Sequence, residues 1–136
     1  MKLELKGTPG EVMRAVESLQ EFGEAKGIPA GILFGLTLAL EECASNIVNH
    51  ALQRDPAQTF EVTLEHTGEA ISIELRDSGI AFDPTLAPPG DGVADDEEEP
   101  GGWGIFLVRK YTDNLIYSRE GGRNVLRLMK SLPLPA

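Results

Sequence analysis

Cysteine is nearly absent from this sequence, and aromatic side chains make up only 6% of its 136 residues. The one cysteine, Cys43, permits no internal disulfide, which excludes the disulfide-stabilised class of small proteins. No run of 18 apolar residues is present, and the first six residues alternate charge with leucine. Both features argue against a signal peptide and a membrane span, so we expect a cytoplasmic protein without a membrane partner.

Basic residues are scarce as well. Lys and Arg number 12 against 22 Asp and Glu, and the formal net charge is −10. A nucleic-acid-binding surface needs a basic stripe, so this balance excludes direct nucleic-acid binding. Part of the acidic excess lies in one run at residues 95–99, and such a run is usually solvated.

What is present is a globular composition with 41% hydrophobic residues. The length fits a single domain over residues 1–136, large enough to bury a core. Apolar residues alternate in some stretches and recur every three or four residues in others, which predicts the order βα, α, ββ, loop, α, ββ. The expected strands are 2–6, 59–66, 70–76, 113–119 and 124–130, and the expected helices are 9 to about 26, 29 to about 51, and 102–111.

This order predicts a two-layer α/β sandwich, with a mixed, mainly antiparallel sheet and about three helices on one face. The segment Thr8-Pro9-Gly10-Glu11 carries a capping-box pattern and predicts the start of the first helix. Residues 84–101 lack apolar periodicity and predict a long loop. Loops of that length in compact domains are usually lids, binding loops or disordered segments, and we expect a lid.

Two glycine-rich segments carry the chemistry. A strand delivers Asp77 into the turn Asp77-Ser78-Gly79, and the cluster Gly101-Gly102-Trp103-Gly104 opens a helix. Glycines let backbone approach a ligand closely, and a helix N-terminus offers free N–H groups to an anion. A carboxylate at one end and an anion cradle at the other fit a nucleotide.

A third pattern lies on the long central helix, where Glu42 and Asn46 are four residues apart and share a face beside the apolar stripe. Each pattern has an ordinary alternative. Asp77-Ser78-Gly79 alone is more often a β-turn, the glycine cluster alone fits a hinge, and Glu42 with Asn46 fits a solvated helix edge. Their occurrence together, in this order, favours a site.

The combined pattern resembles the ATP-binding (Bergerat-type) fold shared by gyrase, Hsp90, sensor histidine kinases and MutL. Within that superfamily it is most similar to the anti-sigma-factor serine kinases of bacteria. The matching segments are 40–51 (LEECASNIVNHA), 77–83 (DSGIAFD), 102–108 (GWGIFLV) and 117–126 (YSREGGRNVL).

The resemblance implies roles for three of these residues. Glu42 would be the general base that deprotonates the attacking hydroxyl, and Asn46 would hold Mg²⁺ through its amide oxygen. Asp77 would accept a hydrogen bond from the amino group of adenine. For His50, which also matches a family position, we expect a structural role.

It also places the remainder of the nucleotide site. Gly79 would let the base lie against backbone, and Phe82 would belong to the same pocket. Gly102 and Gly104 would bring N–H groups to the phosphates at the helix start, and Ile105 would also contact the nucleotide.

One feature departs from the resembled family, whose lid commonly carries a basic residue that faces the γ-phosphate. Residues 84–104 contain no Lys or Arg here. Three explanations stay open: the acidic residues face solvent, a partner supplies the cation, or the protein binds ATP and transfers phosphate poorly.

The sequence therefore leads to three hypotheses. The first is an anti-sigma factor that is also a serine/threonine kinase, acting with ATP and Mg²⁺ on an anti-sigma-factor antagonist, a small STAS-like protein, in a partner switch. Its partners would be that antagonist and a sigma factor, with a homodimer as a further expectation. The second is a non-catalytic ATP-binding switch, and the third is an interaction module without a nucleotide.

Overall fold

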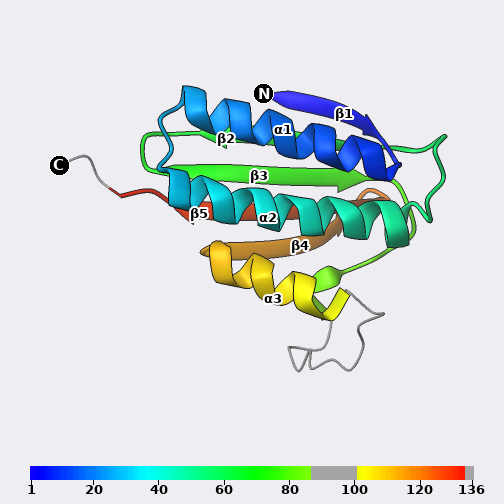
Figure 1. The fold of residues 1–136 in the computed structure, drawn as a ribbon. Coiled ribbons are helices and arrows are strands. Elements are labelled where there is room, and N and C mark those ends of the chain that lie inside the picture. The colour runs from blue at the N-terminus through cyan, green and yellow to red at the C-terminus, as the bar shows by residue number, and fades with distance from the viewer. Residues whose placement is uncertain (87–100, 134–136) are drawn as a thin grey trace.

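The computed structural model describes residues 1–86 and 101–133. Within these residues, five strands and three α-helices form two layers, with the helices on one face of the sheet (Figure 1). The predicted two-layer α/β sandwich is confirmed.

The first strand β1 (Lys2–Lys6) and first helix α1 (Pro9–Ala25) lie where the sequence predicts them. The predicted capping box is wrong in its contacts. The Thr8 side chain makes no capping hydrogen bond, and the Glu11 carboxylate instead accepts one from the backbone N–H of Lys6 at 3.0 Å. The acidic side chain thus joins the strand to the helix rather than closing the helix end on itself.

The central helix α2 (Ala30–Asn46) continues directly into a π-helical turn (Ile47–Ala51). The predicted extent is confirmed, whereas the π turn has no signal in the apolar pattern. By length and composition the whole stretch could cross a membrane, but half of it is buried inside the fold. This is the behaviour of a core helix, and Leu33, Leu36 and Leu40 are all at most 2% exposed.

The central hairpin consists of β2 (Thr59–His66) and β3 (Ala70–Asp77), paired antiparallel as predicted. Alternation places one row of side chains against the helices and the other row on the open face.

The final hairpin consists of β4 (Asn114–Glu120) and β5 (Arg123–Ser131). The turn between them uses Gly121 and Gly122 at φ values of 59° and 79°, which glycine adopts without strain. Strand β5 inserts between β3 and β4, so the sheet order is β1-β2-β3-β5-β4. Every strand pair in the described residues is antiparallel, where the sequence predicts some mixing.

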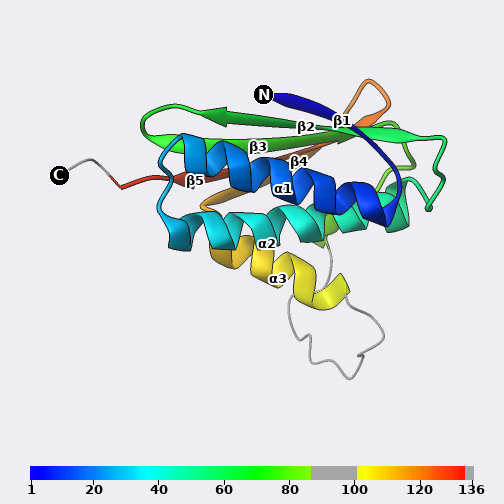
Figure 2. The ribbon, with the colours of Figure 1, turned by 45° about the horizontal axis from the view of Figure 1, so that its top comes forward.

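The three helices divide the inner face of the sheet between them. Helix α1 covers the β1 and β2 side, α2 covers the middle, and α3 (Gly101–Tyr111) packs beside α2 over the β4 edge (Figures 1 and 2). The hydrophobic core lies between the layers and includes residues from all three helices and the sheet.

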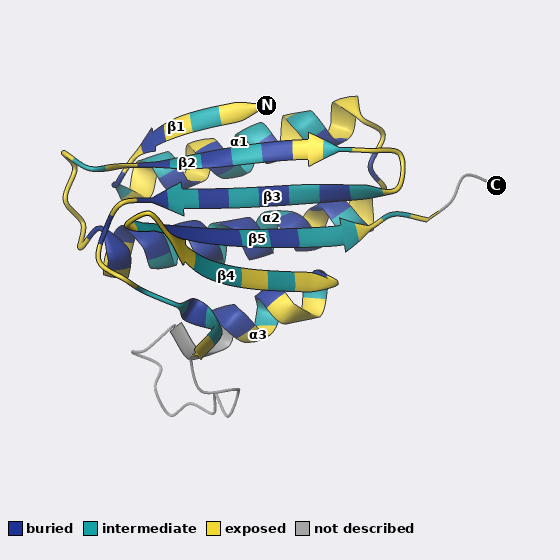
Figure 3. Ribbon diagram, turned by 180° about the vertical axis from the view of Figure 1, so that it is seen from behind, coloured by how far each residue is buried: buried dark blue, intermediate teal, exposed yellow. Residues whose placement is uncertain are grey.

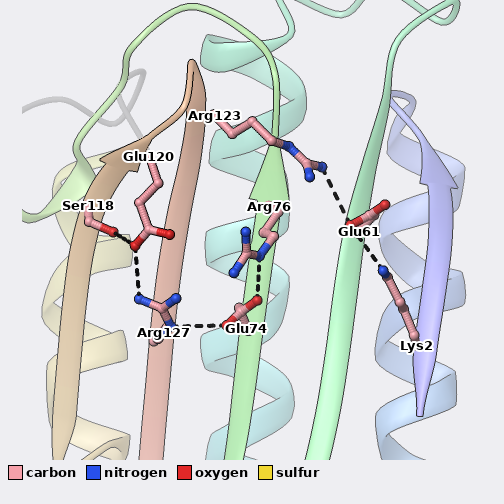
Figure 4. Close-up of polar contacts among 8 residues, drawn as sticks. All are labelled: Lys2, Glu61, Glu74, Arg76, Ser118, Glu120, Arg123 and Arg127. Atoms are coloured by element: carbon pink, nitrogen blue, oxygen red, sulfur yellow. Dashed lines mark hydrogen bonds and ion pairs between the residues drawn. The ribbon is translucent and has the colours of Figure 1, made fainter.

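The opposite face of the sheet is not covered by any described helix (Figure 3). Its exposed rows carry paired charges (Figure 4). Arg127 lies between Glu74 at 3.0 Å and Glu120 at 3.4 Å, and Glu61 lies between Lys2 at 3.6 Å and Arg123 at 3.5 Å. These cross-strand pairs balance the charge of this face internally.

The predicted lid at 84–101 is described only at its two ends. Pro84–Leu86 form a short 3-10 turn, and Gly101 already belongs to α3. The acidic run at 95–99 lies outside the described residues, and its predicted place in a lid stays a prediction.

Candidate nucleotide site

A buried carboxylate ends strand β3. The inward-facing row of this strand is apolar up to Leu75, and the period of two places Asp77 next in the row, at 1% exposure. Its Oδ1 atom accepts hydrogen bonds from the Gly79 N–H at 2.8 Å and from the Asn124 amide at 2.9 Å. Its Oδ2 atom is buried without a donor among the described residues, which is rare for a buried polar atom.

Burial raises the pKa of the Asp77 carboxyl above its ordinary value. Hydrogen bonds from Asn124 and Gly79, and then the charges of Arg119 and Arg123, act in the opposite direction. A buried carboxylate with one unpaired oxygen is typical of a binding site, because a ligand donor can complete it.

Asp77 lines a small cavity between the C-terminal part of α2 and the inner face of the sheet. The cavity has room for about one water molecule, so a purine ring would enter only if some of the lining residues move. Its lining residues are Cys43, Asn46, Ile47, Ala51, Leu75, Asp77, Phe82, Pro84, Tyr117, Asn124 and Leu126.

The turn after Asp77 lies directly against the π turn of the central helix. The Ile80 N–H donates to the Ala51 carbonyl at 3.0 Å. A β-carbon added at Gly79 would collide with that same carbonyl, so only glycine allows this approach. The predicted importance of Gly79 therefore has a packing cause in the protein itself, and its predicted contact with the base stays a prediction.

Phe82 is held from two sides. Its ring stacks on the His50 ring with centroids 4.8 Å apart and planes 18° from parallel. Its N–H donates to the Asn124 side-chain oxygen at 3.2 Å. The expected structural role of His50 fits this contact, and the stack fixes the Phe82 wall of the cavity.

The two polar residues predicted on α2 take different places. Asn46 lines the cavity, while Glu42, one turn earlier, lies against the start of α3. A β-carbon added at Gly104 would lie 2.5 Å from Glu42 Oε2. Burial raises the pKa of the Glu42 carboxyl, and the neighbouring Glu41 charge raises it further.

The first turn of α3 contains Gly102 and Gly104, whose N–H groups are among those that a helix leaves without partners. The contact of Gly104 with Glu42 places this turn against α2, one helical turn before Asn46 along that helix. Ile105 is 3% exposed and belongs to the hydrophobic core, outside the cavity lining. Its predicted contact with the nucleotide stays a prediction.

A protein-only metal cage is absent from the described residues, where no group of three or more His, Cys, Asp or Glu side chains converges. Asn46 and Asn124 both line the cavity, and the amide oxygen of Asn124 already accepts hydrogen bonds within the protein, which leaves the amide of Asn46 as the candidate ligand. This donor set suits Mg²⁺, which is commonly held by one or two protein oxygens together with nucleotide phosphates.

Sequence reasoning missed Asn124 and Tyr117, which line the cavity from β5 and β4. Asn124 is 5% exposed and occupies the inward row that continues with Leu126 and Leu128. A polar residue at the head of an apolar alternating row was the available signal, and it is the same signal that Asp77 gives on β3.

Residues 5–130 match the family described as histidine kinase-like ATPase domain. The chain is 35% identical over 128 residues to the serine/threonine-protein kinase BtrW of Bordetella bronchiseptica, covering 93% of this chain and 89% of that protein.

Two solved structures have a similar fold. The RsbU and RsbW domains of Rv1364c from Mycobacterium tuberculosis superpose with a TM-score of 0.64 at 16% identity, covering all of this chain and 34% of that one. The SiaB–SiaC complex from Pseudomonas aeruginosa gives 0.68 at 12% identity, covering 97% and 88%. These two likenesses concern the fold, and they confirm the predicted architecture.

Proposed function

This chain belongs to the histidine kinase-like ATPase family, and on that premise we propose that it is an anti-sigma factor and ATP-dependent serine/threonine protein kinase acting in a partner switch. The observation that carries the proposal is the buried Oδ2 of Asp77, which has no donor among the described residues, in the cavity that Asn46 also lines. An acceptor without a protein donor suits the amino group of adenine, and the amide oxygen suits a nucleotide-bound cation.

We assign the parts of the nucleotide to different residues of the site. Asp77 binds the adenine amino group, with Gly79 beside the base and Phe82 on the cavity wall. The N–H groups of Gly102 and Gly104 at the start of α3 bind the phosphates.

Asn46 would hold Mg²⁺, which when bound neutralises the phosphate charge. Glu42 would accept the proton that a serine or threonine hydroxyl loses as its oxygen takes the γ-phosphoryl group and ADP leaves. The raised pKa of Glu42 makes its carboxylate a stronger base than an exposed glutamate.

We propose a small antagonist protein, offering a serine or threonine, as the phosphate acceptor, and a sigma factor as the alternative partner. A homodimer and a cytoplasmic location complete the proposal. The relative BtrW carries the name serine/threonine-protein kinase, which supports the acceptor chemistry.

A second candidate, a switch that binds ATP without transferring phosphate, is favoured by one observation: residues 84–104 contain no Lys or Arg. An uncompensated γ-phosphate would leave the transition-state charge without a fixed cation from this segment.

The test combines binding and transfer. Mg-ATP at 100 times its Kd should stabilise the fold by about 2.7 kcal/mol, visible as a rise in melting temperature. Incubation with γ-labelled ATP and an antagonist candidate encoded beside the gene should label a serine or threonine of that candidate. Stabilisation without labelling favours the switch, and the absence of both contradicts nucleotide binding altogether.

A further inference from the structure

The side chain of Asn124, on β5, joins two neighbouring segments, the end of β3 with its following turn and strand β4, through hydrogen bonds with five partners. Its amide nitrogen donates to Asp77 Oδ1 at 2.9 Å and to the Ile80 carbonyl at 2.8 Å. Its amide oxygen accepts from the Phe82 N–H at 3.2 Å, from Arg119 Nη1 at 3.1 Å, and from the Tyr117 hydroxyl. At 5% exposure, this side chain is buried with every hydrogen-bonding group in use.

The orientation of the Asn124 amide is determined by these partners. If its oxygen and nitrogen were exchanged, the nitrogen would face three donors and the oxygen would face the acceptors of Asp77 and Ile80. Only the observed orientation satisfies all five contacts. Asn124 therefore always presents a donor to Asp77.

Two donors consequently converge on Asp77 Oδ1, one from Asn124 and one from the Gly79 N–H at 2.8 Å. This oxygen can act only as an acceptor, whatever else binds nearby. The other oxygen, Oδ2, is left as the one available to a ligand, with no protein donor among the described residues.

We propose that Asn124 is a positioning residue that holds Asp77 as an ionised carboxylate, by donating to Oδ1 within the protein and leaving Oδ2 as the acceptor for a purine amino group. The inference rests on the proposed nucleotide site and adds the residue that determines which base the site accepts. Asn124 acts through Asp77, because its own groups are fully used within the protein.

The first measurement compares ATP with inosine triphosphate, which carries an oxygen acceptor where ATP carries its amino group. Calorimetry on the wild type should show ATP bound at least about tenfold more tightly, because an acceptor facing Oδ2 leaves both groups unpaired. In Asn124→Ala the carboxyl of Asp77 loses a donor that favours its ionised form, so it takes up a proton more readily and Oδ2 can then donate as well as accept. The ratio of the two Kd values should therefore fall about tenfold, toward unity. A loss of affinity that is equal for both nucleotides, with the ratio unchanged within about twofold, overturns the inference.

The second measurement uses Asp77→Asn, which keeps the shape of the side chain. Because Asn124 and the Gly79 N–H still require an acceptor at the Oδ1 position, the new amide must turn its NH₂ group to the ligand side. The group that faces the ligand is then a donor instead of an acceptor, so inosine triphosphate should bind more tightly than ATP. A variant that still prefers ATP, or binds both equally, contradicts the proposed fixing of Oδ1, and this result is independent of how Asn124→Ala folds.

The double variant Asp77→Asn/Asn124→Ala completes the cycle: the amide at residue 77 then keeps only the Gly79 N–H as a donor to its oxygen, so its orientation is held less firmly and the preference for inosine triphosphate should weaken. Asn114→Ala is the matched control, since Asn114 is exposed on the edge strand β4 and should leave the ratio unchanged. If the folded wild type binds neither nucleotide, the proposed function fails together with the inference. If the wild type binds ATP selectively and Asn124→Ala leaves the ratio unchanged, the inference fails alone.

Discussion

The carboxylate of Glu42 lies against the backbone of Gly104, so that a β-carbon at residue 104 would come within 2.5 Å of Oε2. The helix that carries the proposed base and the helix that carries the proposed phosphate cradle therefore meet at this pair. Because Gly104 has no side chain, the Glu42 carboxylate can occupy this space. A larger residue at position 104 would displace that carboxylate.

Gly104→Ala should displace the Glu42 carboxylate and lower phosphotransfer by about ten- to a hundredfold, because small misplacements of a base are costly. Stability should change by less than about 1 kcal/mol, since alanine favours the helix while the new contact opposes it. Labelled-phosphate transfer and urea unfolding measure the two effects. The control is Gly31→Ala on α2, where an added β-carbon meets nothing within 4 Å. It should stabilise the fold slightly and leave transfer unchanged.

Glu42→Gln should reduce transfer by about 10²- to 10⁴-fold, the range for removing a general base, while Mg-ATP binding stays within a few-fold of wild type. Single-turnover transfer and calorimetry separate the two quantities. A Glu42→Gln variant that transfers phosphate at the wild-type rate would show that another group, or none, takes the proton.

Glu41→Gln should move the acid limb of the pH–rate profile to lower pH. Burial and the Glu41 charge both raise the pKa of Glu42, and removing that charge lowers it. Glu42 must be ionised to accept a proton, so a lower pKa keeps the base active in more acidic solution. The measurement is kcat/KM against pH for both proteins. An acid limb that stays in place means that this limb belongs to a different group.

Asp77→Asn should stabilise the fold at neutral pH, on the order of 1 kcal/mol, while it weakens ATP binding. Burial raises the folded-state pKa of Asp77, so the folded protein keeps its proton while the unfolded chain has lost it. Wild-type stability therefore falls as pH rises from the ordinary carboxyl value to the raised one. Urea unfolding across pH should show that Asp77→Asn is more stable than the wild type above the raised pKa of Asp77. Below the ordinary pKa of a carboxyl group, the variant should have no such advantage. Lower stability at neutral pH would mean that the buried carboxylate is net stabilising.

Cys43 should resist alkylation in the native state. It is 1% exposed, and burial raises its pKa to about 12, so almost no thiolate exists at pH 8. Iodoacetamide should label the protein rapidly in concentrated urea and only slowly without it, as mass spectrometry can follow. Rapid native labelling would show that this cavity wall opens readily.

The sequence predicts the strands well where one face is buried. Phe60, Val62 and Leu64 alternate with polar residues because β2 has the core on one side and solvent on the other. The antiparallel pairing of β5 with β3 is less visible, because it depends on a partner far away in the chain. The local alternation of apolar and polar residues therefore predicts where the strands lie. The order of the strands in the sheet depends on pairing between segments far apart in the sequence, which that alternation does not show.

The same limit applies to the site. Asp77 stands out locally because a carboxylate follows an apolar row and precedes a glycine turn. Asn124 does not, since its role arises from a contact with Asp77, 47 residues earlier, and with four other partners brought together only by the fold. The capping contacts predicted for Thr8 are absent for a related reason, because Glu11 accepts from the Lys6 N–H in the preceding strand, a contact that only the fold brings about.

The π turn at Ile47–Ala51 makes the number of residues in this helix part of the architecture. The turn holds one residue more than an α-helical turn, because the Leu52 N–H donates to the Ile47 carbonyl five residues earlier. Removing one of its residues would leave an α-helical turn and change the direction of the Ala51 carbonyl, which accepts from the Ile80 N–H where the helix meets the end of β3. Single-residue deletions within 47–51 should therefore weaken nucleotide binding, which calorimetry can measure.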